Sequence, residues 1–231
     1  MAVYVLIGGK SNTEIKLNKI EQHILSLTNK DKPNLLYCPY ASNDYEKSNK
    51  RFKELVSDLS CDLYLMTEHD YDRFDELLDW CDCIYIGGGS SDDLVQLFKS
   101  KGYDKSLIKY QNTDKVYAGI SAGAMLYTVA AMGDKYAFFD NFITSNYKMV
   151  DCLGLIDYTI CPHYQNEGLT KYNSELKKYS YNALGIEDDT CVIINDNNLS
   201  VIKENKSHSV YLFDYNDDYK MIPLYEGIDY E

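Results

Sequence analysis

The segment Gly119-Ile120-Ser121-Ala122-Gly123 carries the clearest chemical pattern in the sequence. It has the form Gly-x-Ser-x-Gly and lies between a predicted strand at 116–120 and a predicted helix at 122–130. A serine in a sharp strand-to-helix turn needs small neighbours, because such a turn brings backbone segments close together. We therefore predict that Ser121 is a nucleophile and that the backbone N–H of Ala122 donates to the oxyanion. A turn of small residues that only packs a helix on a strand is the alternative.

Three consecutive glycines, Gly87-Gly88-Gly89, close the strand that precedes this segment. Glycine permits backbone orientations that other residues avoid, so the N–H of Gly88 is a candidate second donor to the oxyanion. A tight turn or a phosphate cradle is the alternative. The run lacks the Gly-x-Gly-x-x-Gly spacing and is not followed by Lys-Ser/Thr, which argues against nucleotide binding by these glycines.

A serine nucleophile needs a base, and the chain contains four histidines. His23 falls within a predicted amphipathic helix, His69 in an acidic loop and His208 in a polar hairpin region. We assign no catalytic role to these three. His163 ends an apolar strand, Thr159-Ile160-Cys161-Pro162-His163, and so lies at the carboxyl end of a strand. Because of this position, and because the other three histidines are set aside, His163 is the candidate base.

An acidic turn, Glu187-Asp188-Asp189, lies just before a predicted strand at 190–195. One of these carboxylates could orient the imidazole of His163, as the third member of a Ser-His-acid triad does. A solvated charged turn explains the same residues equally well.

The elements that would position these residues alternate between strand and helix over the first 130 residues. We predict strands at 2–9, 34–39, 62–66, 83–86 and 116–120, and helices at 15–27, 44–59, 73–80, 92–99 and 122–130. Such alternation with short connections predicts a mostly parallel central sheet in a three-layer α/β/α sandwich. Ligands bind outside the carboxyl ends of such strands, so Gly8, Gly9, the triple glycine and Ser121 should share one edge.

The pattern changes after Gly133. We expect a loop or irregular hairpin at 135–149, a strand at 159–161 and a helix at 168–179. A hairpin at 190–195 and 200–203 and a strand at 209–214 should follow, with 214–231 as a solvated surface extension. Nothing resembles a linker, so residues 1–231 are expected to form a single α/β domain.

Composition narrows the function further. The formal net charge is −13, from 36 acidic and 23 basic residues, which argues against nucleic-acid binding. No apolar run approaches the roughly 18 residues of a membrane span, and no signal-peptide pattern is visible. We therefore expect a cytoplasmic protein. Seven scattered cysteines indicate reduced, mostly buried thiols, and no spacing predicts a metal site or a cofactor.

The order Gly-Gly-Gly, Gly-x-Ser-Ala-Gly-Ala, Cys-Pro-His-Tyr and Gly-Ile-acid-acid-x-Thr resembles the peptidase E and cyanophycinase family of serine peptidases. The resemblance spans roughly residues 1–195, and 119–125 with 162–165 are its most specific parts. The chain order Ser, His, acid also differs from the Ser, acid, His order of α/β-hydrolases. The resemblance implies a class I glutamine amidotransferase-like, flavodoxin-like fold and a peptidase that needs no cofactor.

Carried over by position, the resemblance places the nucleophile at Ser121, the base at His163 and the oxyanion donors at Gly88 and Ala122. It aligns the acid with Asp188, with Glu187 as the adjacent alternative. An aspartate after the serine turn is another possibility, where this chain has Asp134 and Asp140. Residues expected to contact a substrate are Gly89, Ser90 and Gln165.

The expected substrate is a short peptide cleaved near its amino terminus, and a homodimer is plausible. Peptidase E has asparagine where this chain has Ser90, and only Lys171, Lys177 and Lys178 supply positive charge between His163 and Asp188. The resemblance therefore does not predict a preference for amino-terminal aspartate. Two alternative hypotheses remain. The protein could be an amidotransferase-like enzyme, or a non-catalytic relative that binds a small molecule or partner at the same sheet edge.

Overall fold

The structure, a computed structural model, describes residues 2–11, 18–133, 148–164, 169–196 and 198–230. Its first sheet contains β1 (Val3–Ile7), β2 (Asn34–Cys38), β3 (Asp62–Leu65), β4 (Cys83–Ile86), β5 (Val116–Ile120), β10 (Thr190–Asn195) and β11 (Asn198–Lys203). The strand order is β11-β10-β1-β5-β4-β2-β3. The neighbouring strands in the stretch β1-β5-β4-β2-β3 pair in parallel. The strands β10 and β11 form an antiparallel hairpin, and β10 pairs in antiparallel register with β1. All five strands predicted before residue 130 are present.

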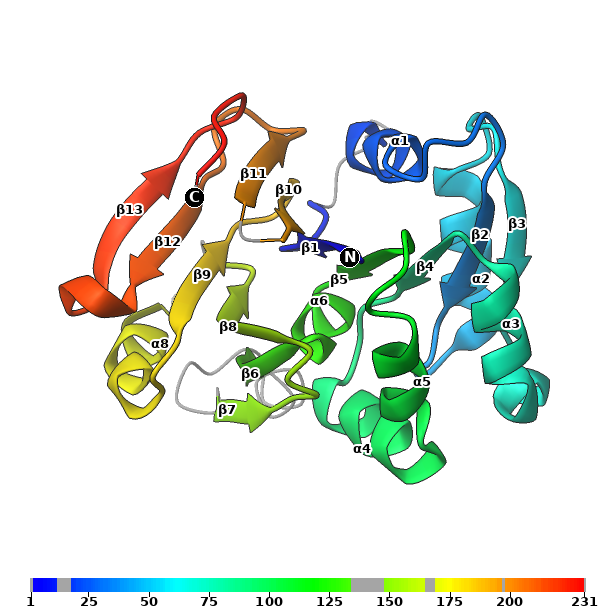
Figure 1. Cartoon of the computed structure of the whole chain (residues 1–231), viewed down its shortest axis with the longest axis horizontal. Coiled ribbons are helices and arrows are strands. Elements are labelled where there is room, and N and C mark those ends of the chain that lie inside the picture. The colour runs from blue at the N-terminus through cyan, green and yellow to red at the C-terminus, as the bar shows by residue number, and fades with distance from the viewer. Residues whose placement is uncertain (1, 12–17, 134–147, 165–168, 197, 231) are drawn as a thin grey trace.

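Helices cover both faces of this sheet (Figure 1). They are α1 (Lys19–Ser26), α2 (Tyr45–Leu55), α3 (Phe74–Trp80), α4 (Ser91–Lys101), α5 (Tyr103–Lys109) and α6 (Ala122–Leu126). Alternate residues of a strand face opposite sides. In β1, Val5 and Ile7 pack in one core with α1 and α2, while Tyr4 and Leu6 pack in the other with α3 to α6. The predicted three-layer α/β/α arrangement is confirmed, and α5 is an additional helix.

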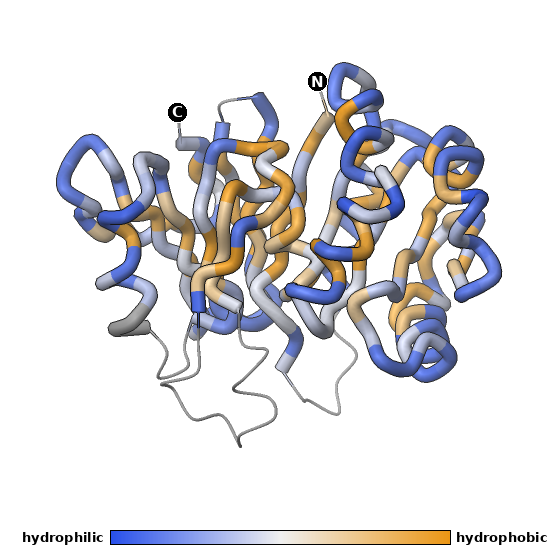
Figure 2. The backbone as a smooth tube through the Cα atoms, turned by 90° about the horizontal axis from the view of Figure 1, so that it is seen from below, coloured by the Kyte–Doolittle hydropathy of each residue, from blue (hydrophilic) through white to orange (hydrophobic). Residues whose placement is uncertain are grey.

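A second sheet was not predicted from the sequence. It contains β6 (Thr128–Gly133), β7 (Lys148–Asp151), β8 (Ile156–Pro162), β9 (Asn182–Ile186), β12 (Val210–Asp214) and β13 (Lys220–Leu224). The strand order is β13-β12-β9-β8-β6-β7. Ile160 and Leu184 join the core that contains α6, and Tyr172 of α8 (Leu169–Glu175) packs on the opposite face. In Figure 2 the apolar segments of both sheets lie inside and polar turns surround them.

The predicted helix at 122–130 is wrong in its second half. The helix α6 ends at Leu126, and β6 begins at Thr128. The hydroxyl of Thr128 donates to the carbonyl of Met125 at 2.8 Å, which satisfies one of the last carbonyls of the helix. The β-branched residues Thr128 and Val129 favour a strand, and pairing with β8 decides the outcome.

The remaining elements differ mainly in extent. The strand predicted at 159–161 is part of the longer β8, and the helix predicted at 168–179 is α8 followed by a short 3-10 turn at Leu176–Lys178. Most of the loop or hairpin predicted at 135–149 lies outside the described residues, as does the predicted start of the first helix. No helix in the described parts of the chain is long and apolar enough to cross a bilayer.

The carboxyl-terminal segment is largely exposed, as predicted, but it forms a paired strand and is not a mere extension. The strands β12 and β13 pair in antiparallel register, and Tyr230 forms a β-bridge with Leu199 of β11. Leu224 is only 1% exposed. Pairing of β13 with β12 therefore brings Leu224 into the core.

Replacing Leu224 with alanine tests this packing. Removal of a buried leucine side chain should lower the free energy of unfolding by about 2–5 kcal/mol. Met221 of the same strand is 51% exposed, so Met221→Ala should change it by less than about 0.5 kcal/mol. Urea titrations followed by circular dichroism would measure both, and equal small effects would show that the segment is not packed.

Candidate active site

Ser121 lies in the turn between β5 and α6, with φ 52° and ψ −117°. Its N–H donates to the carbonyl of Ile7 at 3.0 Å, which ties the turn to the end of β1. A methyl group at Gly119 would overlap the backbone of Gly123, and one at Gly123 would overlap the carbonyl of Ile86. Close backbone contact therefore requires both glycines of the Gly-x-Ser-x-Gly pattern, which confirms the prediction that this turn needs small residues beside the serine.

His163 follows β8 and contacts Ser121 across the junction of the two sheets. Its Nε2 lies 2.9 Å from the Ser121 Oγ, and its Nδ1 lies 2.6 Å from Asp188 Oδ1. These distances are within the hydrogen-bonding reach of a nucleophile, a base and the group that orients the base. The imidazole is 31% exposed and the Asp188 side chain 18%, so the constellation is partly shielded yet open to a ligand.

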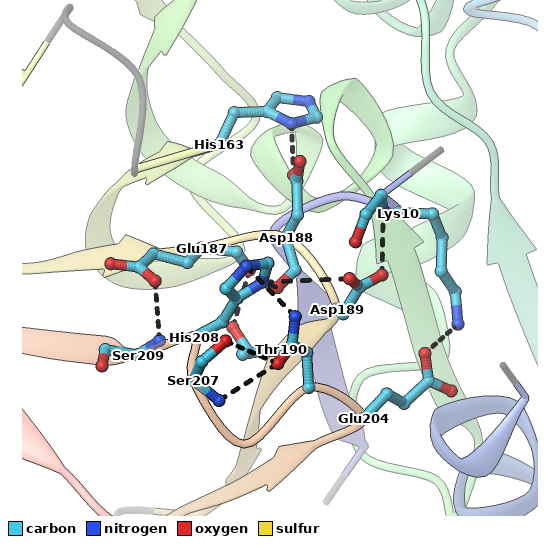
Figure 3. A network of polar contacts seen from close by, with 12 residues as sticks. Lys10, His163, Glu187, Asp188, Asp189, Thr190, Glu204, Ser207, His208 and Ser209 are labelled. Atoms are coloured by element: carbon cyan, nitrogen blue, oxygen red, sulfur yellow. Dashed lines mark hydrogen bonds and ion pairs between the residues drawn. The ribbon is translucent and has the colours of Figure 1, made fainter. Parts of the chain in front are cut away.

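The three acids of the turn at 187–189 point in different directions (Figure 3). The carboxylate of Glu187 accepts from the backbone N–H of Ser209 at 2.8 Å, away from His163. Asp189 is buried, and its Oδ1 accepts from the N–H of Ser11 at 2.9 Å. Asp188 alone of the three contacts the imidazole. Among the adjacent alternatives that the sequence left open, the geometry favours Asp188 over Glu187.

Gly9 makes the closest backbone approach to this site. A methyl group there would overlap both the Asp188 carboxylate and the His163 ring. The carbonyl of Gly9 also accepts from the N–H of Asp189 at 2.9 Å, so β1 holds the acidic turn in place. The sequence placed Gly9 at this edge but did not indicate that it contacts the acid and the base.

The triple glycine lies beside the serine. A methyl group at Gly88 would come within 3.3 Å of the Ser121 Cβ, which places the Gly88 backbone next to the candidate nucleophile. Gly89 has φ 148° and no room for a side chain against the backbone of Ala41. Ser90 caps α4, because its Oγ accepts from the N–H of Asp93 at 3.4 Å. Ala122 is the first residue of α6, where backbone N–H groups have no partner within the helix.

Three other sequence candidates, Gln165, Asp134 and Asp140, lie outside the described residues. Of the histidines set aside, His69 is 87% exposed in a 3-10 helix, as expected of a solvated residue. His208 is different: its Nδ1 lies 2.7 Å from the carbonyl oxygen of Asp188. Sequence reasoning missed this residue, since only the pairing of β9 with β12 brings it to the site.

A cavity of about 460 Å³ opens beside Gly88 and Ile120. Its walls come mainly from α2 and from the ends of β1, β2 and β4. Its charged lining residues are Lys10, Asp44, Lys47 and Arg51. Lys10 is paired with the buried carboxylates of Glu21 and Glu204, so the positive charge of the cavity comes from Lys47 and Arg51. The cavity is large enough for a small polar ligand such as one or two amino-acid residues.

Comparisons with known proteins identify the family of the chain. The sequence profile of peptidase family S51 matches residues 4–202. A protein of Bacillus subtilis strain 168 described as uncharacterized peptidase YgaJ is 28% identical over 166 residues, covering 69% of this chain and 67% of that protein. Uncharacterized peptidase Lmo0363 of Listeria monocytogenes is 33% identical over 89 residues, covering 37% of this chain and 41% of that protein.

Two solved structures share the fold. A peptidase from an acI-B1 Actinobacterium superposes with a TM-score of 0.73 at 17% identity, covering 100% of this chain and 96% of that one. A peptidase E protein of Listeria monocytogenes EGD-e gives a TM-score of 0.62 at 19% identity, covering 89% of this chain and 100% of that one. The family match and the shared fold thus define a peptidase with a flavodoxin-like α/β fold. The chain belongs to peptidase family S51.

The contact at Gly9 leads to a prediction about the reactivity of Ser121. Gly9→Ala should displace the Asp188 carboxylate and the imidazole, and lower the rate of Ser121 labelling by a fluorophosphonate probe about 100-fold. Ile108→Ala, a control, changes a side chain of α5 that is 50% exposed. An unchanged labelling rate in Gly9→Ala would show that this contact does not hold the site.

The cysteines lead to a second prediction. All seven are free thiols, and burial raises the pKa of Cys38, Cys81 and Cys152 to about 12. A thiol with a raised pKa is a poor nucleophile at neutral pH. Iodoacetamide should therefore modify the native protein slowly, first at the half-buried Cys61, and leave the labelling of Ser121 unchanged. Mass spectrometry would check this, with the urea-unfolded protein as a control in which all seven react.

Proposed function

We propose that the protein is a serine peptidase that hydrolyses short peptides through Ser121, His163 and Asp188. The observation that carries the proposal is the pair of contacts on the His163 ring, 2.9 Å to Ser121 Oγ and 2.6 Å to Asp188 Oδ1. Membership of peptidase family S51 supports the same reaction class. Strand ends from both sheets bring these three side chains together. A chance contact between three polar side chains is therefore a weak explanation of this arrangement.

The proposed reaction begins with the attack of Ser121 Oγ on the scissile carbonyl carbon. The Asp188 carboxylate accepts a hydrogen bond from Nδ1–H of His163, which leaves Nε2 free to take the serine proton. The N–H groups of Gly88 and Ala122 would then bind the oxyanion. His163 next gives the proton to the leaving amine, and the acyl group remains on Ser121. Water, deprotonated by His163, finally hydrolyses this ester and restores the serine.

The cavity beside Gly88 is the proposed place for the acyl side of the peptide. It adjoins Gly88 and Ile120, next to the nucleophile, and its volume of about 460 Å³ suits a short peptide better than a folded chain. Lys47 and Arg51 of α2 supply positive charge on its walls. The segment between His163 and Asp188 is therefore not the only source of cations near the site. Gly89 and Ser90, which follow Gly88 in the chain, and Gln165 remain proposed substrate contacts.

Mutating the candidate triad and its neighbour tests the proposal. Ser121→Ala should abolish cleavage of a panel of di- to hexapeptides read by mass spectrometry. Asp188→Asn should lower kcat by roughly 10³–10⁴-fold, because an amide no longer stabilises the required tautomer or the imidazolium. Glu187→Gln is the matched control. Its side chain still accepts from Ser209, so kcat should stay within about threefold of the wild type.

The rival readings correspond to other outcomes of the same experiment. Cleavage that persists in Ser121→Ala would exclude this residue as the nucleophile. Ammonia release from glutamine in place of peptide cleavage would favour the amidotransferase-like reading. A wild-type protein that neither cleaves the panel nor reacts with a fluorophosphonate would favour a binding role at this edge. Loss of activity in Glu187→Gln but not in Asp188→Asn would reassign the acid.

A further inference from the structure

We propose that His208 is a positioning residue of this site, acting through the backbone of Asp188. The inference rests on the proposed function, since it concerns the acid of the proposed triad. The register of β9 and β12 pairs Val210 with Ile186, and continuing it by two residues brings His208 opposite Asp188. The imidazole is buried except for 24% of its surface, and its Nδ1 lies 2.7 Å from the Asp188 carbonyl oxygen.

The surroundings of His208 fix its tautomer. A carbonyl oxygen only accepts, so Nδ1 must carry the hydrogen that is donated to Asp188. The Oδ1 of Asn205 accepts from the N–H of Ser207 at 3.1 Å and from its hydroxyl at 2.7 Å. The amide nitrogen of Asn205 must then face Nε2 of His208, at 3.3 Å, and donate to it. Both ring nitrogens are thereby used by a neutral imidazole with Nδ1 protonated.

The peptide between Asp188 and Asp189 is held at both edges, because its carbonyl accepts from His208 and its N–H donates to the carbonyl of Gly9. Bonds to Ser209 hold Glu187 on one side, and the bond to Gly9 holds Asp189 on the other. Asp189 has φ 55°, in the left-handed region that few residues other than glycine, asparagine and aspartate adopt. Within this frame, the carbonyl of Asp188 points to His208 while its carboxylate points to His163 (Figure 3). Without the His208 donor, only the bond to Gly9 restrains this peptide plane, so the plane can tilt about that bond and move the carboxylate.

The charged groups near His208 are consistent with a structural rather than a proton-transfer role. Oδ2 of the buried Asp189 lies 3.8 Å from Nδ1, beyond hydrogen-bonding distance. The ring does not contact the Asp188 carboxylate in the described structure, because it binds that residue through the carbonyl. His208 therefore supports the acid without touching a reacting atom.

His208→Ala, His208→Asn and His69→Ala form the test set. Asparagine keeps an N–H donor near the position of Nδ1, and His69 is a distant exposed histidine that controls for the loss of an imidazole. We expect kcat to fall about 10- to 100-fold in His208→Ala with little change in KM, since a small displacement of the acid affects the chemical step. His208→Asn should recover most of this loss, and His69→Ala should behave as the wild type.

A proton NMR spectrum gives a readout that does not need a substrate. The short hydrogen bond between His163 Nδ1 and Asp188 should give a strongly downfield signal, which His163→Gln would remove and so assign. The signal should be lost or shifted in His208→Ala and kept in His208→Asn. If the wild type shows the signal but cleaves no peptide, the proposed function fails while the positioning role stands.

Other outcomes would overturn the inference. An unchanged signal and unchanged kcat in a folded His208→Ala variant would show that the acid does not depend on His208. Equal losses in His208→Ala and His208→Asn would show that the donor is not what matters. Should His208→Ala fail to fold, Asn205→Ala provides the second test. It removes the partner of Nε2 and leaves His208 in place, so it should broaden or shift the same signal, and an identical spectrum would contradict the proposal.

Discussion

The close approach of the end of β1 to the acidic turn is the constraint on which the rest of the site depends. Gly9 lies against both the Asp188 carboxylate and the His163 ring, and its carbonyl accepts from Asp189. The first sheet supplies β1 and Ser121, while the second sheet supplies His163 and leads into the turn. The two sheets can therefore form one site only if this position has no side chain. Gly9 is thus a packing requirement of the candidate site.

Three of the seven non-glycine residues that have positive φ in the described structure lie at this site. Ser121, His163 and Asp189 all have positive φ, at 52°, 52° and 55°, and each follows or precedes a strand at the common edge. Residues with side chains hold such conformations at a cost of about 1–3 kcal/mol each, and only where the surroundings leave no alternative. Parallel pairing on both sides of β5, pairing of β8 with β9 and the bonds around the turn supply that restraint. A rigid framework thus fixes polar side chains that would otherwise sample many orientations.

A buried ionic network anchors the loop that follows Gly9. Lys10 bridges Glu21 of α1 at 3.0 Å and Glu204, just after β11, at 2.5 Å, and both carboxylates are almost fully buried. Burial lowers the pKa of Lys10, but attraction to the two carboxylates outweighs it and leaves the pKa raised. Glu204 also donates its N–H to the carbonyl of Asp189. Because an unpaired buried charge is costly, this network ties the end of β1, α1 and the acidic turn to one another.

The sequence by itself determined the serine turn, the histidine at a strand end and the alternating first half of the chain, because these depend on local patterns. Glycines around Ser121 and period-two apolar runs are visible without knowing what packs against them. Tertiary contacts explain the second sheet, the end of α6 at Leu126 and the contact of Asp188, rather than Glu187 or Asp189, with His163. They also place His208 beside Asp188. These features depend on strand pairing between segments far apart in the chain, and a one-residue change of register or direction would turn a different side chain toward His163.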